Sequence, residues 1–300
     1  APEQRSEPRF SVYPVIVEYA EEQLNAQGNA SATRRRHAET YVELGEALVE
    51  QTGSVDRRQG FDRLAVELDN LLAVWRRFGE SDPAFAARAA RCMVRVLQVR
   101  GPLLLLRNLL EQDPENTAWR GQLDGVSTTL RLARADLLRI DGKIAECTAE
   151  LKALEAGAEK AKDRRLLGEA LSRLGLCARV EGQRDEAADL LTQALDHMEA
   201  AGGPVEQARV INNLAVLHIE LGRSVHAEIF QRRSVDLLRK AGDHDRLAGA
   251  LCNVGILCVD RGDLLDADEY YQDALTLSQS AGHGEAQAMI LSNLGTLYWL

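Results

Sequence analysis

The chain has few residues that interrupt helices and no apolar run long enough to cross a membrane. Only seven of its 300 residues are proline, and most of them precede residue 115. Proline removes a backbone donor and clashes with the preceding helical turn, so we expect uninterrupted helices in the later part of the chain. No stretch of 18 consecutive apolar residues occurs, which predicts that no helix spans a membrane. The first residues are polar and charged, unlike those of a secretory signal peptide.

The motifs that mark common catalytic sites are also missing. There is no H-E-x-x-H zinc motif, no G-x-S-x-G nucleophile elbow and no G-x-x-x-x-G-K-[ST] phosphate loop. The acidic runs at 243–245 and 263–269 lack the spacing of a calcium loop and fall at expected turns, where Asp caps backbone N–H groups. We therefore predict no catalytic residue, no metal and no cofactor in this stretch, which is not an enzyme.

Cysteine is scarce: five are present and none belongs to a C-x-x-C pair. Cys147 and Cys177 stand where other copies of the repeat described below have Ala and Leu, and we interpret all five cysteines as core residues without a zinc or redox role. Cys252 and Cys258 are six residues apart, about 240° around a helix, which excludes a shared metal. Free thiols fit a reducing cytoplasm, so we expect a cytoplasmic protein.

Positive charge is not concentrated anywhere. The net charge is −10, and the only basic triplet is Arg34–Arg36, which we interpret as a solvated turn before a helix. Binding to nucleic acid needs clustered Lys and Arg that displace counterions from phosphates. The sequence therefore predicts no direct contact with nucleic acid.

A sequence repeat with a period of about 40 residues dominates the second half of the chain, and such fixed-period self-similarity indicates a stack of similar structural units. The spacing is kept by three series of residues: Leu174-Gly175, Leu214-Ala215, Val254-Gly255 and Leu294-Gly295; Gly142, Gly182, Gly222 and Gly262; and Gly202, Gly242 and Gly282.

Each unit is expected to form two helices. Residues 171–178 place small and apolar side chains at i, i+3, i+4 and i+7, which is one face of a helix. Gly182 then ends that helix, since glycine adopts the left-handed conformation at low cost. A second apolar helix runs through 187–195 and stops near Gly202, and small residues at Gly175 and Ala187 allow the two helices to approach closely. Neither helix buries its stripe alone, so neighbouring pairs must stack.

These units resemble the tetratricopeptide repeat. That family begins a unit with large-x-x-large-small-x-x-aromatic and places small residues on the second helix. The residues at these positions are Ile211, Leu214, Ala215, His218, Ala227 and Ser234, then Leu251, Val254, Gly255, Cys258, Ala267, Tyr271 and Ala274, and His218 and Cys258 depart from the pattern at its aromatic position. The usual period of the family is shorter, about 34 residues, so the helices here look longer. The resemblance implies an all-α fold, a right-handed superhelix of helix-turn-helix repeats.

A second resemblance covers the segment before the repeats. Phe10 and Val12 alternate like a short strand, and Pro14 is suited to open a helix. Residues 9–20 are similar to a phrase found where the winged-helix module ends in signal-transduction ATPases with numerous domains (STAND), among them bacterial transcriptional regulators. Similar phrases follow at 36–41 and 67–71. The competing interpretation is that the apolar and aromatic residues of these phrases are only the buried faces of ordinary helices.

This order of phrases implies three regions. Residues 1–25 would be the end of a winged-helix-like module, 26–120 a helical bridge with degenerate repeats, and 121–300 the solenoid. Its first repeat is degenerate and its last is cut short at Leu300, so we expect more repeats in the natural protein and an ATPase upstream. The function implied is a sensor or regulatory arm of such an ATPase. The alternative is a stand-alone scaffold for protein assembly.

Ligands of a solenoid bind along the concave face, which the first helix of each repeat lines. The candidate residues there are Asn213, Asn253, Asn293, Arg173, Arg209, Asn212, Arg179 and Trp299, with apolar neighbours such as Val216, Ile219, Cys252 and Ile256. The expected partner is a protein or peptide, or else a small-molecule effector, with oligomerisation on activation.

Two interpretations of these polar side chains stay open. Asn is a mediocre helix former, so its recurrence at one position of successive repeats suggests a purpose. An amide can bracket the backbone of an extended peptide, as the family resemblance implies, or it can tie adjacent repeats together. The arginines can contact a carboxylate or phosphate, or form local ion pairs with residues such as Glu169 or Glu206.

Overall fold

The computed structural model describes residues 13–51, 57–111, 123–281 and 284–299. Within these ranges every regular element is an α-helix, which confirms the predicted fold class. The strand expected at Phe10–Val12 and the first half of the winged-helix-like region lie outside the described residues, as does Gly282. The helices are α1 (Pro14–Ala26), α2 (Ala30–Gln51), α3 (Arg57–Val66), α4 (Leu68–Phe78), α5 (Pro83–Arg100), α6 (Leu103–Glu111), α7 (Gly125–Ile140), α8 (Ile144–Ala161), α9 (Arg164–Val180), α10 (Arg184–Ala201), α11 (Pro204–Glu220), α12 (Ser224–Ala241), α13 (His244–Arg261), α14 (Leu264–Ala281) and α15 (Gly284–Trp299).

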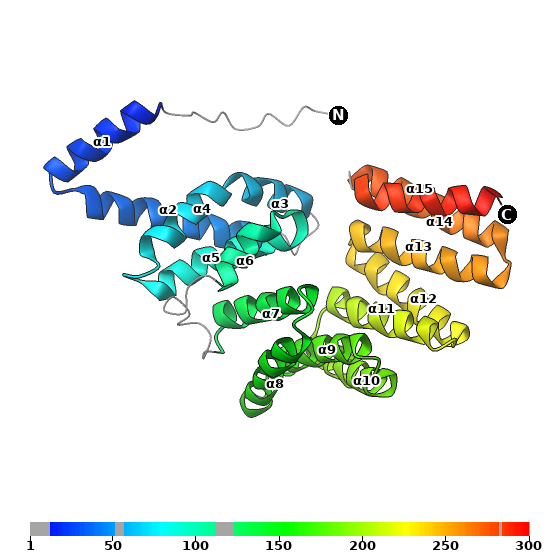
Figure 1. The fold of residues 1–300 in the computed structure, drawn as a ribbon. Coiled ribbons are helices and arrows are strands. Elements are labelled where there is room, and N and C mark those ends of the chain that lie inside the picture. Colours follow the sequence, from blue (N-terminus) through cyan, green and yellow to red (C-terminus); the bar gives the residue numbers. More distant parts are fainter. Residues whose placement is uncertain (1–12, 52–56, 112–122, 282–283, 300) are drawn as a thin grey trace.

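The helices are arranged as an arch in Figure 1. Helices α2–α6 form one arm, α7–α10 form the base, and α11–α15 form the other arm, while α1 projects from the first arm. Helices α8 and α10 lie below α7 and α9, away from the inside of the arch. None of the helices in the described part of the chain combines the length and apolar character that a bilayer crossing requires.

The first arm is a bundle that shares its core with the base. One apolar cluster joins buried side chains of α2–α6 to Leu130 and Leu137 of α7. Arg34–Arg36, predicted as a solvated turn, lie inside α2 because that helix begins at Ala30, just after the left-handed Gly28. Arg35 lies 4.2 Å above the ring of Phe85 and pairs with Asp82 at 2.7 Å. The triplet is therefore helical rather than a turn, while Arg36 is exposed as expected.

The second half consists of antiparallel helix pairs, α7 with α8, α9 with α10, α11 with α12 and α13 with α14, followed by α15. The glycine at each intra-pair turn has a left-handed backbone, with φ of +80° at Gly182, and a Cβ there would meet no neighbour. The requirement for glycine is therefore conformational. A backbone bond of the Schellman type closes each turn, from Lys143 to Leu138, from Gln183 to Ala178, from Arg223 to His218 and from Asp263 to Cys258.

Close packing within each pair depends on small residues, as predicted. A Cβ added to Gly175 would lie 2.8 Å from Cγ of Leu191, and one added to Gly255 would lie 2.5 Å from the ring of Tyr271. Both distances are shorter than van der Waals contact. The repeating pattern thus fixes the turn conformation and the distance between paired helices.

Candidate ligand-binding face

The predicted binding residues lie on the first helix of each pair. Arg173 and Arg179 belong to α9, and Arg209, Asn212 and Asn213 belong to α11. Asn253 is on α13, while Asn293 and Trp299 are on α15. The structure thus brings them to successive first helices, and their role in ligand binding stays a prediction.

Each of the three repeating asparagines donates a hydrogen bond to the preceding first helix. The Nδ2 of Asn213 lies 3.5 Å from Oγ of Ser172, that of Asn253 lies 3.0 Å from Oδ1 of Asn212, and that of Asn293 lies 3.2 Å from Sγ of Cys252. These bonds tie adjacent repeats together. They use one N–H of each amide, which carries a second N–H and a carbonyl oxygen. The amides therefore keep capacity for a ligand, and peptide binding by them stays a prediction.

Asn212 has a different place in the fold. Its Oδ1 accepts from Asn253 of α13 and, at 3.1 Å, from Nε2 of the fully buried Gln231 of α12. The side chain therefore links three helices of two repeats. Its carbonyl oxygen is occupied by protein donors.

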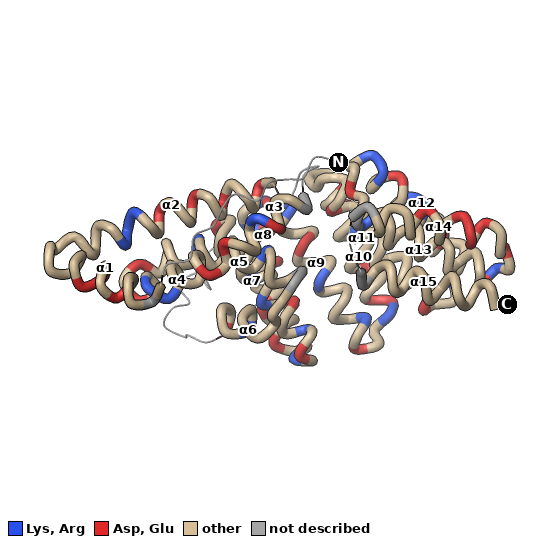
Figure 2. The backbone as a smooth tube through the Cα atoms, turned by 90° about the horizontal axis from the view of Figure 1, so that it is seen from above, with Lys and Arg blue, Asp and Glu red and all other residues tan. Residues whose placement is uncertain are grey.

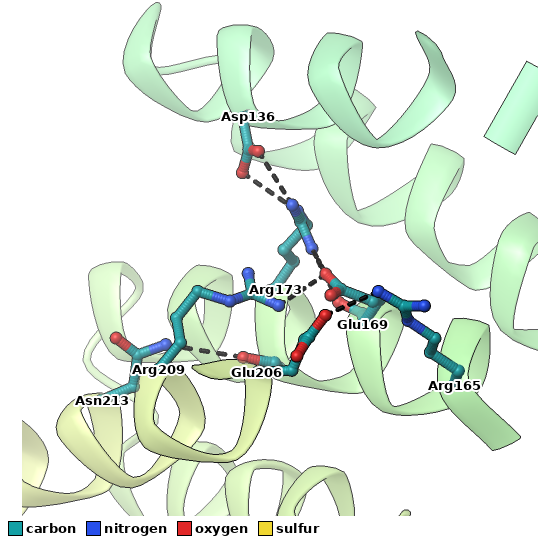
Figure 3. A network of polar contacts seen from close by, with 8 residues as sticks. Asp136, Arg165, Glu169, Arg173, Glu206, Arg209 and Asn213 are labelled. Atoms are coloured by element: carbon teal, nitrogen blue, oxygen red, sulfur yellow. Dashed lines mark hydrogen bonds and ion pairs between the residues drawn. The ribbon is translucent and has the colours of Figure 1, made fainter. Parts of the chain in front are cut away.

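The arginines of α9 and α11 form a network of ion pairs, shown in Figure 3. Arg173 points its Nε and Nη2 at the two oxygens of Asp136 on α7, each at 3.1 Å, and its Nη1 donates to the Glu169 carboxylate. Arg209 approaches the same carboxylate at 2.6 Å from α11. The network connects three successive repeats through α7, α9 and α11.

Charge is balanced in this network. Burial alone would raise the pKa of Glu169, but Arg173 and Arg209 lower it to about 2, so the carboxylate is ionised at neutral pH. Burial would likewise lower the pKa of the Arg173 guanidinium, and Asp136 and Glu169 raise it instead. Two carboxylates thus face two guanidiniums. A ligand anion would have to replace these pairs.

The other arginines near this face are paired as well. Arg179 contacts Glu220 at 2.7 Å, and Arg165 contacts Glu206 at 2.6 Å. The local ion pairs anticipated from the sequence are therefore present, and the role of Arg173, Arg179 and Arg209 in ligand binding stays a prediction. Figure 2 shows acidic and basic positions interleaved along the chain.

An apolar strip of Val216, Ile219 and Ile256 lies on the same first helices as the asparagines. Ile219 and Ile256 are about one-third exposed, Val216 is half-buried, and the Trp299 side chain is almost fully exposed at the end of α15. Cys252, predicted for this face, is completely buried. Its position faces the adjacent helix, where Asn293 donates to its sulfur.

The sequence analysis missed Asp136. It stands one repeat before Leu176 and two repeats before Val216, so projecting the repeat register back into the degenerate unit was the signal that could have found it. His218 behaves as expected of a packed residue, since its ring stacks on His226 and Phe230 at 5.5 and 5.3 Å. Among the described residues, no group of three or more His, Cys, Asp and Glu is arranged to hold a metal ion.

Comparison with known proteins agrees with this architecture. The family model for the tetratricopeptide repeat matches residues 166–240 and 206–280. The crystal structure of BtubC (BKLC) from P. vanneervenii is similar, with a TM-score of 0.55, 17% identity, and coverage of 74% of this chain and 92% of that one. No curated protein matches the sequence.

A second similar structure belongs to a larger protein. It is a signal transduction ATPase with numerous domains that carries a tetratricopeptide repeat sensor, from Pyrococcus horikoshii. The TM-score is 0.56 at 11% identity, and the match covers 85% of this chain but 42% of that one. At these identities both structures establish the fold alone.

Proposed function

We propose that the face formed by α9, α11, α13 and α15 binds an extended segment of another polypeptide, given that residues 166–280 match the family model for the tetratricopeptide repeat. The observation that carries the proposal is the row of half-exposed asparagines beside the aliphatic strip. Amides can hold a peptide backbone by donating and accepting hydrogen bonds, and the strip can cover its apolar side chains. The role is non-catalytic.

The charges of the face point to a ligand recognised without an acidic group. Arg173 and Arg209 are already neutralised by Asp136 and Glu169, and Arg179 by Glu220. Displacing such a partner leaves a carboxylate without its cation, which costs free energy when the group is mostly buried. Backbone amides and aliphatic side chains of the ligand therefore supply the recognition.

We propose further that the chain is the sensor arm of a STAND-type regulatory ATPase. The support is the order of the sequence phrases at 9–20, 36–41 and 67–71 before the repeats, together with a fold shared with the sensor-bearing STAND protein. A ligand on the arm would act by favouring one of two arrangements of arm and ATPase, which requires different affinities for the two. A scaffold without a switch is the alternative outcome.

The peptide-binding proposal is tested with peptides selected from a random dodecapeptide library on the purified chain. Affinity for a selected peptide should fall tenfold or more in the Asn213→Ala, Asn253→Ala double variant, because two backbone contacts are lost. Exposed Asn25 on α1 provides a matched control, and Asn25→Ala should leave affinity unchanged. Thermal unfolding must be measured beside affinity, since the two amides also join repeats.

Crosslinking gives an independent readout of the face. A photoreactive residue in place of Ile256 on α13 should capture the peptide, and the same residue in place of Ile229 on α12 should not. Both side chains are exposed, so they differ in the face that they occupy. Equal capture at both positions, or unchanged affinity in the double variant, contradicts the assignment.

The STAND context is tested on the intact natural polypeptide. If a phosphate-binding loop and a winged helix precede these residues, addition of the selected peptide should change the rate of nucleotide exchange. Exchange that is independent of the peptide contradicts the sensor role and leaves peptide binding by the face standing. A natural chain without those modules supports the scaffold instead.

A further inference from the structure

Two cysteines of adjacent helix pairs are in contact. Cys147 lies in the first turn of α8 and Cys177 in the last turn of α9, and their sulfurs are 3.4 Å apart. Both side chains are buried, each 1% exposed. The Sγ of Cys147 also lies 3.1 Å from the carbonyl oxygen of Ala135. The sequence predicted two separate core cysteines and gave no sign of this contact.

The two sulfur atoms are in van der Waals contact. Sulfur atoms in a disulfide are about 2.05 Å apart, so these two need to approach by little more than 1 Å for a bond to form. Cys147 lies about one helical turn after the turn at 141–143 between α7 and α8, and Cys177 lies about one helical turn before the turn at 181–183 between α9 and α10. A small peroxide would reach the pair when one of these turns opens.

The protonation of the pair is asymmetric. The hydrogen bond between the two thiols lowers the pKa of Cys177, against the effect of burial. The same hydrogen bond, together with burial, raises the pKa of Cys147. Cys177 is therefore the more readily ionised of the two thiols, and the thiolate is the nucleophilic form.

We propose that Cys147 and Cys177 are a modification site, at which a peroxide forms a reversible disulfide that joins α8 to α9. The Cys177 thiolate attacks one oxygen of the peroxide, the O–O bond breaks, and a sulfenic acid and hydroxide result. The Cys147 sulfur then attacks the sulfenic sulfur, its proton leaves with the expelled hydroxide as water, and the S–S bond forms. In total, two thiols and hydrogen peroxide give one disulfide and two water molecules, and two equivalents of an external thiol reverse the reaction.

The bond would cross the boundary between two repeats. Asp136 and Arg173 join α7 to α9 across the same boundary by a noncovalent ion pair. A disulfide there is a permanent link until it is reduced. Oxidation would therefore fix the angle at which the first helix pair meets the rest of the solenoid.

The test uses the full chain, reduced and then treated with hydrogen peroxide under denaturant-free conditions. Trypsin separates the two cysteines, with Cys147 in peptide 144–152 and Cys177 in peptide 174–179. We expect a crosslinked species of these two peptides in mass spectra, loss of two of the five thiols per chain, and their recovery with dithiothreitol. The rate should rise with pH, following ionisation of the Cys177 thiol.

Two variants and two internal thiols serve as controls. The Cys92→Ser, Cys252→Ser, Cys258→Ser variant should form the bond, and the Cys177→Ser variant should not. Burial raises the pKa of Cys252 and of Cys258, so these buried thiols should react more slowly than Cys177. The proposal is overturned if Cys147 and Cys177 remain thiols in the folded wild-type chain, react no faster than Cys252 and Cys258, or appear only in links between chains.

Discussion

Glu169 is the centre of the ion-pair network, and its replacement by glutamine tests whether that network stabilises the arch. Its side chain is 17% exposed and accepts from Arg173, which is 12% exposed. The shift of its pKa from 4.5 to about 2 corresponds to roughly 3 kcal/mol between the charged and neutral forms. Arg209 is one-third exposed and partly solvated after the change. We therefore expect Glu169→Gln to lower the free energy of unfolding by about 2 kcal/mol.

A surface pair in the same chain supplies the control. Arg233 of α12 pairs with Glu199 of α10, and both side chains are more than 40% exposed. Exposed pairs contribute about 0–1 kcal/mol, so Glu199→Gln should change stability by less than about 0.5 kcal/mol. Both variants are compared with wild type in urea unfolding followed by circular dichroism, analysed with a nearest-neighbour repeat model.

The pH dependence distinguishes charge from packing. Because the folded pKa of Glu169 is depressed, its contribution is fully present above the unfolded pKa near 4.5 and is lost as pH falls toward about 2. The stability difference between wild type and Glu169→Gln should therefore shrink as pH falls through that range. A difference that is the same at pH 7 and pH 2.5, or a cost as large for Glu199→Gln, would refute the electrostatic account.

Two further predictions concern a turn and a histidine. Gly182→Ala should destabilise the chain by about 1 kcal/mol because φ is +80° there. Gly249→Ala should stabilise it by about 0.5 kcal/mol, because a Cβ meets no neighbour at this position inside α13. Thermal unfolding of both variants measures this contrast, and equal effects on stability would contradict it. Burial, then His226 and Arg223, lower the pKa of His218, so the folded state favours its neutral ring and stability should fall as pH drops below about 6.5. His218→Phe should remove that part of the pH dependence, which urea titrations between pH 5 and 8 detect, and an unchanged slope would contradict it.

The sequence predicts the repeat architecture because that part depends on local rules. Gly182 permits the left-handed backbone that ends α9, and Gly175 leaves room for Leu191 of the paired helix. Small residues recur at both positions with the period of the repeat, so the sequence shows them. Side chains that meet across a boundary between repeats depend on the angle between helix pairs, which the period does not encode.

The candidate site illustrates that limit. Asn213 and Asn253 were correctly placed on successive first helices, but the sequence left open whether their amides tie repeats or hold a ligand, and the structure shows the ties. The bidentate contact of Arg173 with Asp136 and the contact of Cys147 with Cys177 arise from the same boundary geometry. Arg34–Arg36 fall in a helix because its start is set by Gly28 rather than by charge.

The direction of the asparagine bonds bears on how such an array grows. The donor is always in the later repeat, and the acceptor is always the residue just before the corresponding asparagine position of the earlier one: Ser172, Asn212 and Cys252. When one whole repeat is duplicated in tandem, the copy carries both groups. Its asparagine can donate to the repeat before it, and the residue just before that asparagine can accept from the repeat after it. The acceptor can be a hydroxyl, an amide or a thiol, so the copies can diverge at this position while every new junction is bonded from the moment it arises.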